Sequence, residues 1–179
     1  MSSLEIRLSG TGGQGLQMAA QILADAFVRD GRQVARSQSY EPTSRGGLSR
    51  SDLVVADDRP VYPLATGIDL LLVLAPQAAP VSAHLVRHSG LVLVDEDLVT
   101  EPPRCGARVL GQPLTRTARE LGSHRITNVV SLGALAGLWP LCSFEALEAA
   151  VESFTPPRFH DLNLRALRAG RALVDSVPV

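Results

Sequence analysis

Lysine is absent from this sequence of 179 residues, because all 17 of its basic residues are arginine. The chain therefore has no amine for a Schiff base and no P-loop lysine for a nucleoside triphosphate. This absence excludes Walker-type phosphoryl transfer, and we interpret it as a result of genomic base composition.

Cysteine is scarce, since Cys105 and Cys142 are the only two and stand far apart. By itself, the chain has too few clustered thiolates for an iron–sulfur cluster or a Cys-rich zinc site. His84 and His88 share one face of an expected helix, but residues 85–87 between them include no general-base glutamate. We therefore predict no metal ligands. No serine-centred elbow, Cys–His pair or pair of carboxylates stands out, so we predict no catalytic residue either.

Strong net charge and long apolar runs are missing as well. The net charge is −1, which provides no field to attract nucleic acid or an acidic membrane surface. The longest apolar run, 129–141, is interrupted by Ser131 and Pro140 and is too short to span a bilayer. The N-terminus lacks the basic and apolar regions of a signal peptide. With two unpaired cysteines, these features predict a cytoplasmic protein that binds neither nucleic acid nor membrane.

What remains is the composition of an ordinary globular domain, with 45% hydrophobic and 20% charged residues. The chain is long enough for a substantial core and contains no repeat or low-complexity linker, so we expect a single domain over residues 1–179. Strand-like and helix-like segments alternate, which predicts a three-layer α/β/α, Rossmann-like domain with a mostly parallel, mixed sheet. Strands are expected at 4–8, 33–39, 53–55, 69–74, 91–94 and 108–110, and helices at 16–30, 77–88, 115–121, 128–139, 143–154 and 162–175.

The first strand and the first helix are joined by a glycine turn, Gly10-Thr11-Gly12-Gly13-Gln14-Gly15. Glycine lets the backbone turn sharply, and the start of the helix offers unpaired N–H groups and the positive end of a dipole. We predict that these six residues contact an anion or a phosphate. The alternative is a tight turn that only packs the helix on the sheet. The turn fits the G-x-G-x-x-G pattern of dinucleotide sites, but residues 36–40 include no carboxylate for the ribose of NAD.

The second candidate for binding is Arg45-Gly46-Gly47. An arginine followed by two glycines can present its planar fork while the backbone stays close to a ligand or a neighbour. A flexible surface loop is the alternative. Because this loop follows the second strand, we expect it at the sheet edge that carries the glycine turn, where ligands gather.

The segment 128–139 is apolar around nearly its whole circumference, so it must be covered on all sides by its own domain or by a partner. Gly133 permits close approach of another backbone, and Gly170 lies on a small-residue face of the last helix that we interpret as packing. Thr127 is the expected N-cap, and Asn128 is expected to satisfy backbone groups.

These motifs, in this order, resemble the gamma subunit of 2-oxoacid:ferredoxin oxidoreductases. Residues 39–55 look most like the 2-oxoglutarate type, while the pyruvate, 2-oxoisovalerate and indolepyruvate types remain open. The resemblance spans nearly the whole chain and includes, besides the glycine turn, Ser39-Tyr40-x-Pro42-x-x-Arg45-Gly46-Gly47, Gly122, Asn128-Val129-Val130-x-Leu132-Gly133-Ala134 and Asn163-x-x-Ala166-x-x-x-Gly170.

The resemblance implies a subunit of an enzyme that converts a 2-oxoacid and coenzyme A to acyl-CoA and CO2 and passes the electrons to ferredoxin. It implies partners in a dimer or hetero-oligomer: thiamine-binding alpha and beta subunits, and an iron–sulfur subunit or ferredoxin. Thiamine diphosphate and the iron–sulfur clusters are then held by these partners, and this chain is inactive alone. For the chain itself it implies assembly and a contact with a coenzyme A phosphate, through the amides of Gly12 to Gly15. Arg45 would pair with a phosphate or with a carboxylate of a partner.

The loop departs from the family pattern at two positions, where Glu41 and Thr43 replace the usual glycine and glutamate. Without glycine, positive φ is restricted at position 41, so we expect a different path and changed contacts. Two other functions stay open, a stand-alone Rossmann-like nucleotide-binding protein and a homo-oligomeric binding module.

Overall fold

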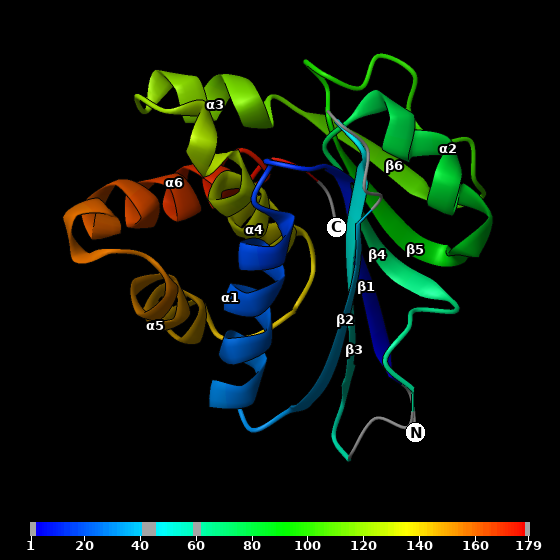
Figure 1. The fold of residues 1–179 in the computed structure, drawn as a ribbon, viewed down its shortest axis with the longest axis horizontal. Coiled ribbons are helices and arrows are strands. Elements are labelled where there is room, and N and C mark those ends of the chain that lie inside the picture. The colour runs from blue at the N-terminus through cyan, green and yellow to red at the C-terminus, as the bar shows by residue number, and fades with distance from the viewer. Residues whose placement is uncertain (1–2, 41–45, 59–61, 178–179) are drawn as a thin grey trace.

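The computed structural model describes residues 3–40, 46–58 and 62–177. Its centre is a six-stranded sheet in the order β2-β3-β1-β4-β5-β6 (Figure 1). β1, β4, β5 and β6 run parallel to one another, whereas β3 lies antiparallel between β1 and β2. This confirms the predicted α/β class with a mostly parallel, mixed sheet. The strands are β1 (Leu4–Thr11), β2 (Gln33–Tyr40), β3 (Leu48–Ala56), β4 (Ile68–Val73), β5 (Val86–Asp95) and β6 (Arg108–Gln112).

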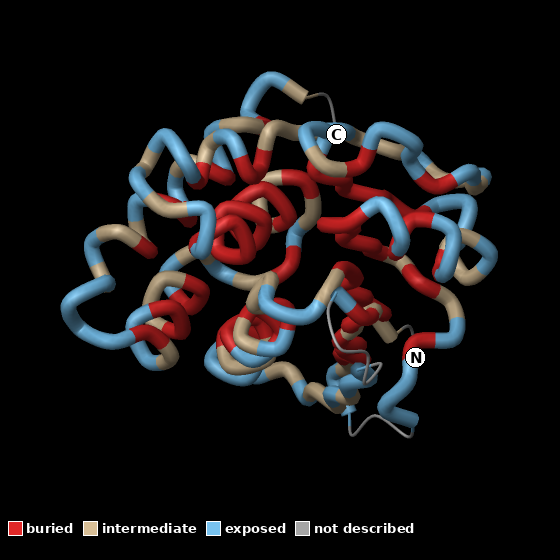
Figure 2. The backbone as a smooth tube through the Cα atoms, turned by 45° about the horizontal axis from the view of Figure 1, so that its top comes forward, coloured by how far each residue is buried: buried red, intermediate tan, exposed pale blue. Residues whose placement is uncertain are grey.

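Helices cover the two faces of the sheet to very different depths (Figure 1). In the described ranges, the thin layer on one face consists of η1 (Pro76–Ala78), the one-turn α2 (Ala79–Ser82) and η2 (Ala83–Leu85). The buried parts of the chain gather at the centre, where the sheet meets the helices (Figure 2). The thick layer on the opposite face contains α1 (Leu16–Arg29), α3 (Leu114–Glu120), η3 (His124–Ile126), α4 (Thr127–Leu138), α5 (Phe144–Phe154), η4 (Pro157–Phe159) and α6 (His160–Ala172).

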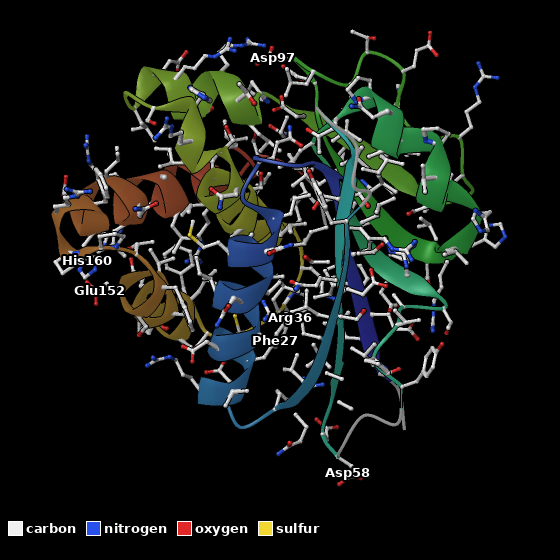
Figure 3. The ribbon with its side chains drawn as sticks, viewed as in Figure 1. Phe27, Arg36, Asp58, Asp97, Glu152 and His160 are labelled. Carbon is white, nitrogen blue, oxygen red and sulfur yellow. The ribbon has the colours of Figure 1, made fainter. Side chains whose placement is uncertain are left out.

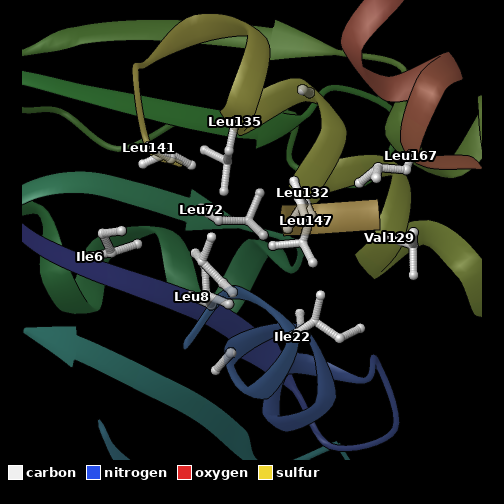
Figure 4. Close-up of a cluster of buried hydrophobic side chains, with 14 of the residues drawn as sticks. Ile6, Leu8, Ile22, Leu72, Val129, Leu132, Leu135, Leu141, Leu147 and Leu167 are labelled. Carbon is white, nitrogen blue, oxygen red and sulfur yellow. The ribbon is translucent and has the colours of Figure 1, made fainter. Parts of the chain in front are cut away.

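Successive side chains of the central strands point to opposite faces of the sheet, and this divides the core into two clusters. Leu70 and Leu72 of β4 belong to the larger cluster, whereas Leu71 and Val73 belong to the smaller cluster that includes η1 and α2. Successive side chains of a strand point to opposite faces, so a strand that is apolar throughout requires cover on both sides. The close-up in Figure 4 shows Leu72 within the larger cluster, among Ile6, Leu8, Leu132 and Leu147.

The apolar helix α4 is covered within the chain, which is one of the two predicted alternatives. It packs mainly against α6, and this packing requires glycine on both helices. A Cβ atom on Gly133 would collide with the carbonyl oxygen of Leu167, and one on Gly170 would collide with that of Val130. No helix in the described part of the chain is long and apolar enough to cross a membrane.

Two expectations about helices are wrong. The helix predicted over 77–88 is replaced by short turns up to Leu85, and Val86 begins β5 because it pairs with Ile68 of β4. Thr127 is not the N-cap of α4 but its first helical residue, and its hydroxyl donates to the carbonyl of His124 at 2.7 Å. Strand pairing overrides the helical preference of the segment that ends at Val86. At Thr127, the hydrogen bond to the carbonyl of His124 replaces the capping bond.

Candidate functional site

The glycine turn follows β1 at the edge of the sheet where the parallel strands end, which is the upper edge in Figure 1. Gly13 and Gly15 have φ values of +91° and +72°, a region that favours glycine. Gly15 is the N-cap of α1, a helix of 14 residues whose first turn carries no acidic side chain. The structure therefore has the predicted strand, turn and helix, with the positive end of the α1 dipole at this edge.

Gln14 holds the turn together from within. Its side-chain oxygen accepts the N–H of Thr11 at 2.8 Å, and its side-chain nitrogen donates to the carbonyl of Leu74 at 2.7 Å. The N–H of Leu74 also donates to the carbonyl of Ser9 at 2.9 Å. Both polar atoms of the Gln14 side chain are thus engaged inside the chain, where they tie the end of β1 to the residue after β4.

Gly12 joins the turn to the second predicted segment. Its N–H donates to the carbonyl of Gly47 at 3.1 Å. The ring of Tyr40 lies so close that a Cβ atom on Gly12 would be 2.8 Å from it. The structure therefore brings Gly47, with its neighbour Gly46, to the edge that carries the glycine turn, as expected. The remaining positions of interest in this loop lie outside the described residues: Glu41, Thr43 and Arg45.

Asn128 places the start of α4 beside the start of α1. Its side-chain nitrogen donates to the carbonyl of Gly15 at 3.1 Å, which confirms that it satisfies a backbone group. The residue is buried, and its Oδ1 atom has no hydrogen-bond partner in the described part of the chain. A Cβ atom on Gly15 would lie 2.6 Å from the Asn128 nitrogen, so glycine is needed here for space as well as for its φ.

The amides of the turn divide into two groups. Those of Thr11, Gly12 and Gln14 donate to acceptors within the chain. Those of Gly13 and Gly15 have no acceptor among the residues that the structure describes. An anion at this turn would therefore meet the amides of Gly13 and Gly15, and not that of Gly12.

A hollow of about 460 Å³ opens beside Gly13, and we refer to it as the Gly13 hollow. It is lined by the glycine turn together with residues of α3 and η3, and three of its side chains are basic: Arg119, His124 and Arg125. Sequence reasoning missed these three residues. These three residues form no recognisable motif in the sequence. They reach the site only because α3 and η3 pack beside the turn.

Asp95 fixes α3 beside the Gly13 hollow. It is fully buried at the end of β5, and it accepts the N–H of Thr115 at 3.1 Å, the hydroxyl of Thr115, and the N–H of Asp97 at 3.2 Å. Burial raises the pKa of the Asp95 carboxyl above its usual value, although these hydrogen bonds oppose the effect. Arg116 pairs with Glu96 at 3.1 Å and with Asp97 at 2.5 Å, and it lowers the pKa of Asp97.

The end of β2 differs from that of a nicotinamide site. Arg36 lies against α1 (Figure 3), where its Nη1 atom donates to the carbonyl of Gln17 at 3.3 Å. The strand has no carboxylate to hold a ribose, as the sequence indicated. In the ranges that the structure describes, no group of three or more His, Cys, Asp or Glu residues could hold a metal ion. The site offers amides and cationic side chains, which are groups that bind anions.

The known proteins that are similar to this chain in sequence belong to oxidoreductases that act on 2-oxoacids. Residues 5–173 match the family described as pyruvate ferredoxin/flavodoxin oxidoreductase. A relative from Methanothermobacter thermautotrophicus, named 2-oxoglutarate synthase subunit KorC, is 34% identical over 178 residues. The match covers 95% of this chain and 94% of the relative.

Two solved structures have the same fold. The gamma subunit of a keto/oxoacid ferredoxin oxidoreductase from Geobacter sulfurreducens is 37% identical, with a TM-score of 0.84 over 94% of this chain and 96% of its own. The 2-oxoglutarate:ferredoxin oxidoreductase from Magnetococcus marinus was solved with 2-oxoglutarate, coenzyme A and succinyl-CoA bound. It is 22% identical, with a TM-score of 0.88 over 99% of this chain but 32% of its own.

Proposed function

Because this chain belongs to the pyruvate ferredoxin/flavodoxin oxidoreductase family, we propose that it is the gamma subunit of a multi-subunit 2-oxoglutarate:ferredoxin oxidoreductase. The complex converts 2-oxoglutarate and coenzyme A to succinyl-CoA and CO2 and passes the electrons to ferredoxin. The observation that carries this proposal is the end-to-end match with the relative named 2-oxoglutarate synthase subunit KorC.

In this proposal the chain, acting as one domain over residues 1–179, supplies an assembly and coenzyme-binding edge while partner chains perform the redox chemistry. Thiamine-binding alpha and beta subunits hold thiamine diphosphate, and an iron–sulfur subunit or ferredoxin receives the electrons. The free cysteines Cys105 and Cys142 support this division, because two separated thiols cannot ligate a cluster. The same free thiols favour a cytoplasmic complex.

The chain's own contact with coenzyme A is proposed at the glycine turn, Gly10 to Gly15, and at Arg45, Gly46 and Gly47. The unused amides of Gly13 and Gly15 support a phosphate at the turn. The hydrogen bond between Gly12 and Gly47 supports a joint site, because it brings both segments to one edge. Arg45 would add a planar, permanently charged fork for the phosphate.

The test is co-expression of this chain with the polypeptides encoded next to it, followed by purification through a tag on this chain. We expect thiamine-binding chains to co-purify and the complex to reduce ferredoxin when coenzyme A and a 2-oxoacid are present. Activity with 2-oxoglutarate should exceed that with pyruvate, 2-oxoisovalerate or indolepyruvate, and the chain alone should show no turnover.

Three results would contradict the proposal. Turnover by the isolated chain would show that it carries its own catalytic groups. Micromolar binding of a nicotinamide cofactor to the isolated chain would favour a stand-alone nucleotide-binding protein. A homo-oligomer with no thiamine-binding partner would favour a separate binding module.

A further inference from the structure

We propose that two copies of this chain pair through their β2 strands, which lie antiparallel, so that the two six-stranded sheets form one continuous sheet. The contact extends to α1, which lies beside β2 (Figure 1). This inference goes beyond the proposed function, because it concerns the contact between two copies of this chain and not the contact with thiamine-binding partners.

β2 is an open edge of the sheet. The strand order places it at one end, and among the described segments only β3 pairs with it. Its main-chain groups make no hydrogen bond to any other described segment. In an antiparallel ladder, alternate residues direct their N–H and C=O groups away from the neighbouring strand. An edge strand of eight residues therefore presents a row of unused donors and acceptors to one further strand.

β2 also lacks the features that usually keep edge strands apart, which are short length, exposed charge, proline and bulges. The strand at the opposite edge, β6, has only five residues and begins at the exposed Arg108. β2 contains no proline and no acidic residue, and its register with β3 is regular from Gln33 to Tyr40. Its one charged residue, Arg36, lies against α1 (Figure 3), where it donates to the carbonyl of Gln17 at 3.3 Å. The edge is therefore open to pairing.

The surface beside this edge has the composition of an interface. α1 presents Gln17, Gln21 and Val28, which are exposed and spaced along one face of the helix. β2 adds exposed amide and hydroxyl side chains and the ring of Tyr40. Val28 and Tyr40 are large apolar residues with exposed fractions of 58% and 51%. Arg36 is the only charged residue in this set, and interfaces are depleted in charged residues but enriched in tyrosine and arginine.

The chemistry of this surface favours a second copy of the chain as the partner. Amide and hydroxyl groups both donate and accept hydrogen bonds, so two identical surfaces of this kind meet without repulsion. A twofold dimer requires such self-complementarity. A strongly charged partner would find little to pair with, because the single cation of the set is already engaged with α1.

The positions of the side chains select one register. In an antiparallel twofold pair, residues directly opposite each other point to the same face of the joined sheet. A register centred on Ser37 pairs residues 34–40 of the two copies, with Arg36 opposite Gln38 and Val34 opposite Tyr40. A register centred on Arg36 would place two guanidinium groups directly opposite each other, which is destabilising. The register centred on Ser37 is therefore the one that we propose.

The first test is sedimentation velocity of the full-length chain over a series of concentrations, where we expect a dimer. Gln38→Arg places a second cation opposite Arg36 and should raise the dissociation constant about tenfold, because the pair occurs twice in each dimer. Gln38→Glu places a carboxylate there and should lower it by about threefold. The matched controls are Gln77→Arg and Gln77→Glu, which make the same changes at an exposed position of η1 and should leave the constant unchanged.

The second test is hydrogen exchange of the main-chain amides, which locates the contact. The amides of β2 should become more protected as the concentration of the chain rises, whereas those of β6 should not change. A chain that stays monomeric at its highest soluble concentration overturns the inference. A dimer that responds equally to the Gln38 and Gln77 variants, or that adds no protection in β2, also overturns it, because the contact then uses another surface.

The purified complex separates this inference from the proposed function. A complex that oxidises 2-oxoglutarate and contains two copies of this chain, joined by a contact that Gln38→Arg weakens, supports both. An active complex in which a strand of a different subunit protects β2 overturns the inference and leaves the proposed function standing. A dimer that behaves as expected but binds no thiamine-binding chain overturns the function and leaves the inference standing.

Discussion

Arg7 and Asp52 lie opposite each other on β1 and β3 and form a two-pronged ion pair that is almost completely buried. The Nε and Nη2 atoms of Arg7 donate to the two carboxylate oxygens at 2.7 and 2.8 Å. The Nη1 atom donates to the hydroxyl of Ser82 at 3.1 Å, and Asp52 accepts the N–H of Ala65 at 3.2 Å. The pair therefore links the sheet to α2 and to the segment before β4, on the thinly covered face.

Removing one partner of this pair should be strongly destabilising. Asp52→Ala leaves a buried guanidinium without its counter-charge, and we expect the free energy of unfolding to fall by about 3–5 kcal/mol. Urea unfolding followed by circular dichroism measures this loss. The double variant Arg7→Met with Asp52→Leu removes both charges and should recover most of it. If the double variant were as unstable as Asp52→Ala, the loss of stability would come from lost side-chain packing and not from an unpaired buried charge.

The close contact between α4 and α6 predicts a specific sensitivity at Gly170. Gly170→Ala forces the added methyl group against the carbonyl of Val130, so α6 must move away. We expect a loss of about 1–3 kcal/mol in the free energy of unfolding. Ala172→Ser, at an exposed position of the same helix, should change it by less than about 0.5 kcal/mol. Equal stability of the two variants would contradict this packing.

The glycine turn predicts different responses at Gly13 and Gly15, although both have positive φ. A Cβ atom on Gly13 meets nothing within 4 Å, so Gly13→Ala should cost only the backbone strain, about 1–2 kcal/mol. Gly15→Ala adds a collision with Asn128 and should lower the melting temperature further. Calorimetric unfolding of the two variants compares them directly. If Gly13→Ala were the less stable of the two, the proximity of Asn128 to Gly15 would be unimportant.

The raised pKa of Asp95 predicts how stability depends on pH. The folded protein holds this proton more tightly than the unfolded chain, so the associated stability is present below the unfolded pKa and lost as pH rises through the folded pKa. Asp95→Asn removes this titration. The difference in free energy of unfolding, wild type minus variant, should therefore fall as pH rises between the two pKa values and stay constant above them.

Urea unfolding at a series of pH values measures this difference. Asp161→Asn, an exposed carboxyl on α6, serves as the control and should not reproduce the same fall. A wild-type-minus-Asp95→Asn difference that rises with pH would show that the folded protein lowers the pKa of Asp95.

The glycine turn could be predicted from the sequence because it depends on neighbours along the chain. An alternating strand, closely spaced glycines and a helix with 3.6-residue periodicity determine it locally. The position of Gly47 could also be predicted, because β2 runs in the same direction as β1 and therefore ends at the same edge. The absence of a carboxylate from residues 36–40 was visible directly in the sequence, and it remains an argument against a nicotinamide site.

Contacts between distant segments could not be predicted in the same way. Arg119, His124 and Arg125 reach the hollow because Asp95 anchors the start of α3 through Thr115, a contact that no local pattern records. The helix expected over 77–88 failed for a related reason, since Val86 gains a strand partner in Ile68 that its own neighbours do not reveal. Pairing of this kind outweighs the weak preference of a short segment.

The hydrogen bond from Gly12 to Gly47 also limits how this protein can diversify during evolution. The two loops are joined by a hydrogen bond between main-chain atoms. Substitution of side chains elsewhere in the loops therefore cannot replace this bond. Insertions and deletions should therefore be selected against wherever they would shift either glycine. Descendants that acquire new ligands are expected to alter the residues around this junction while they inherit the junction itself.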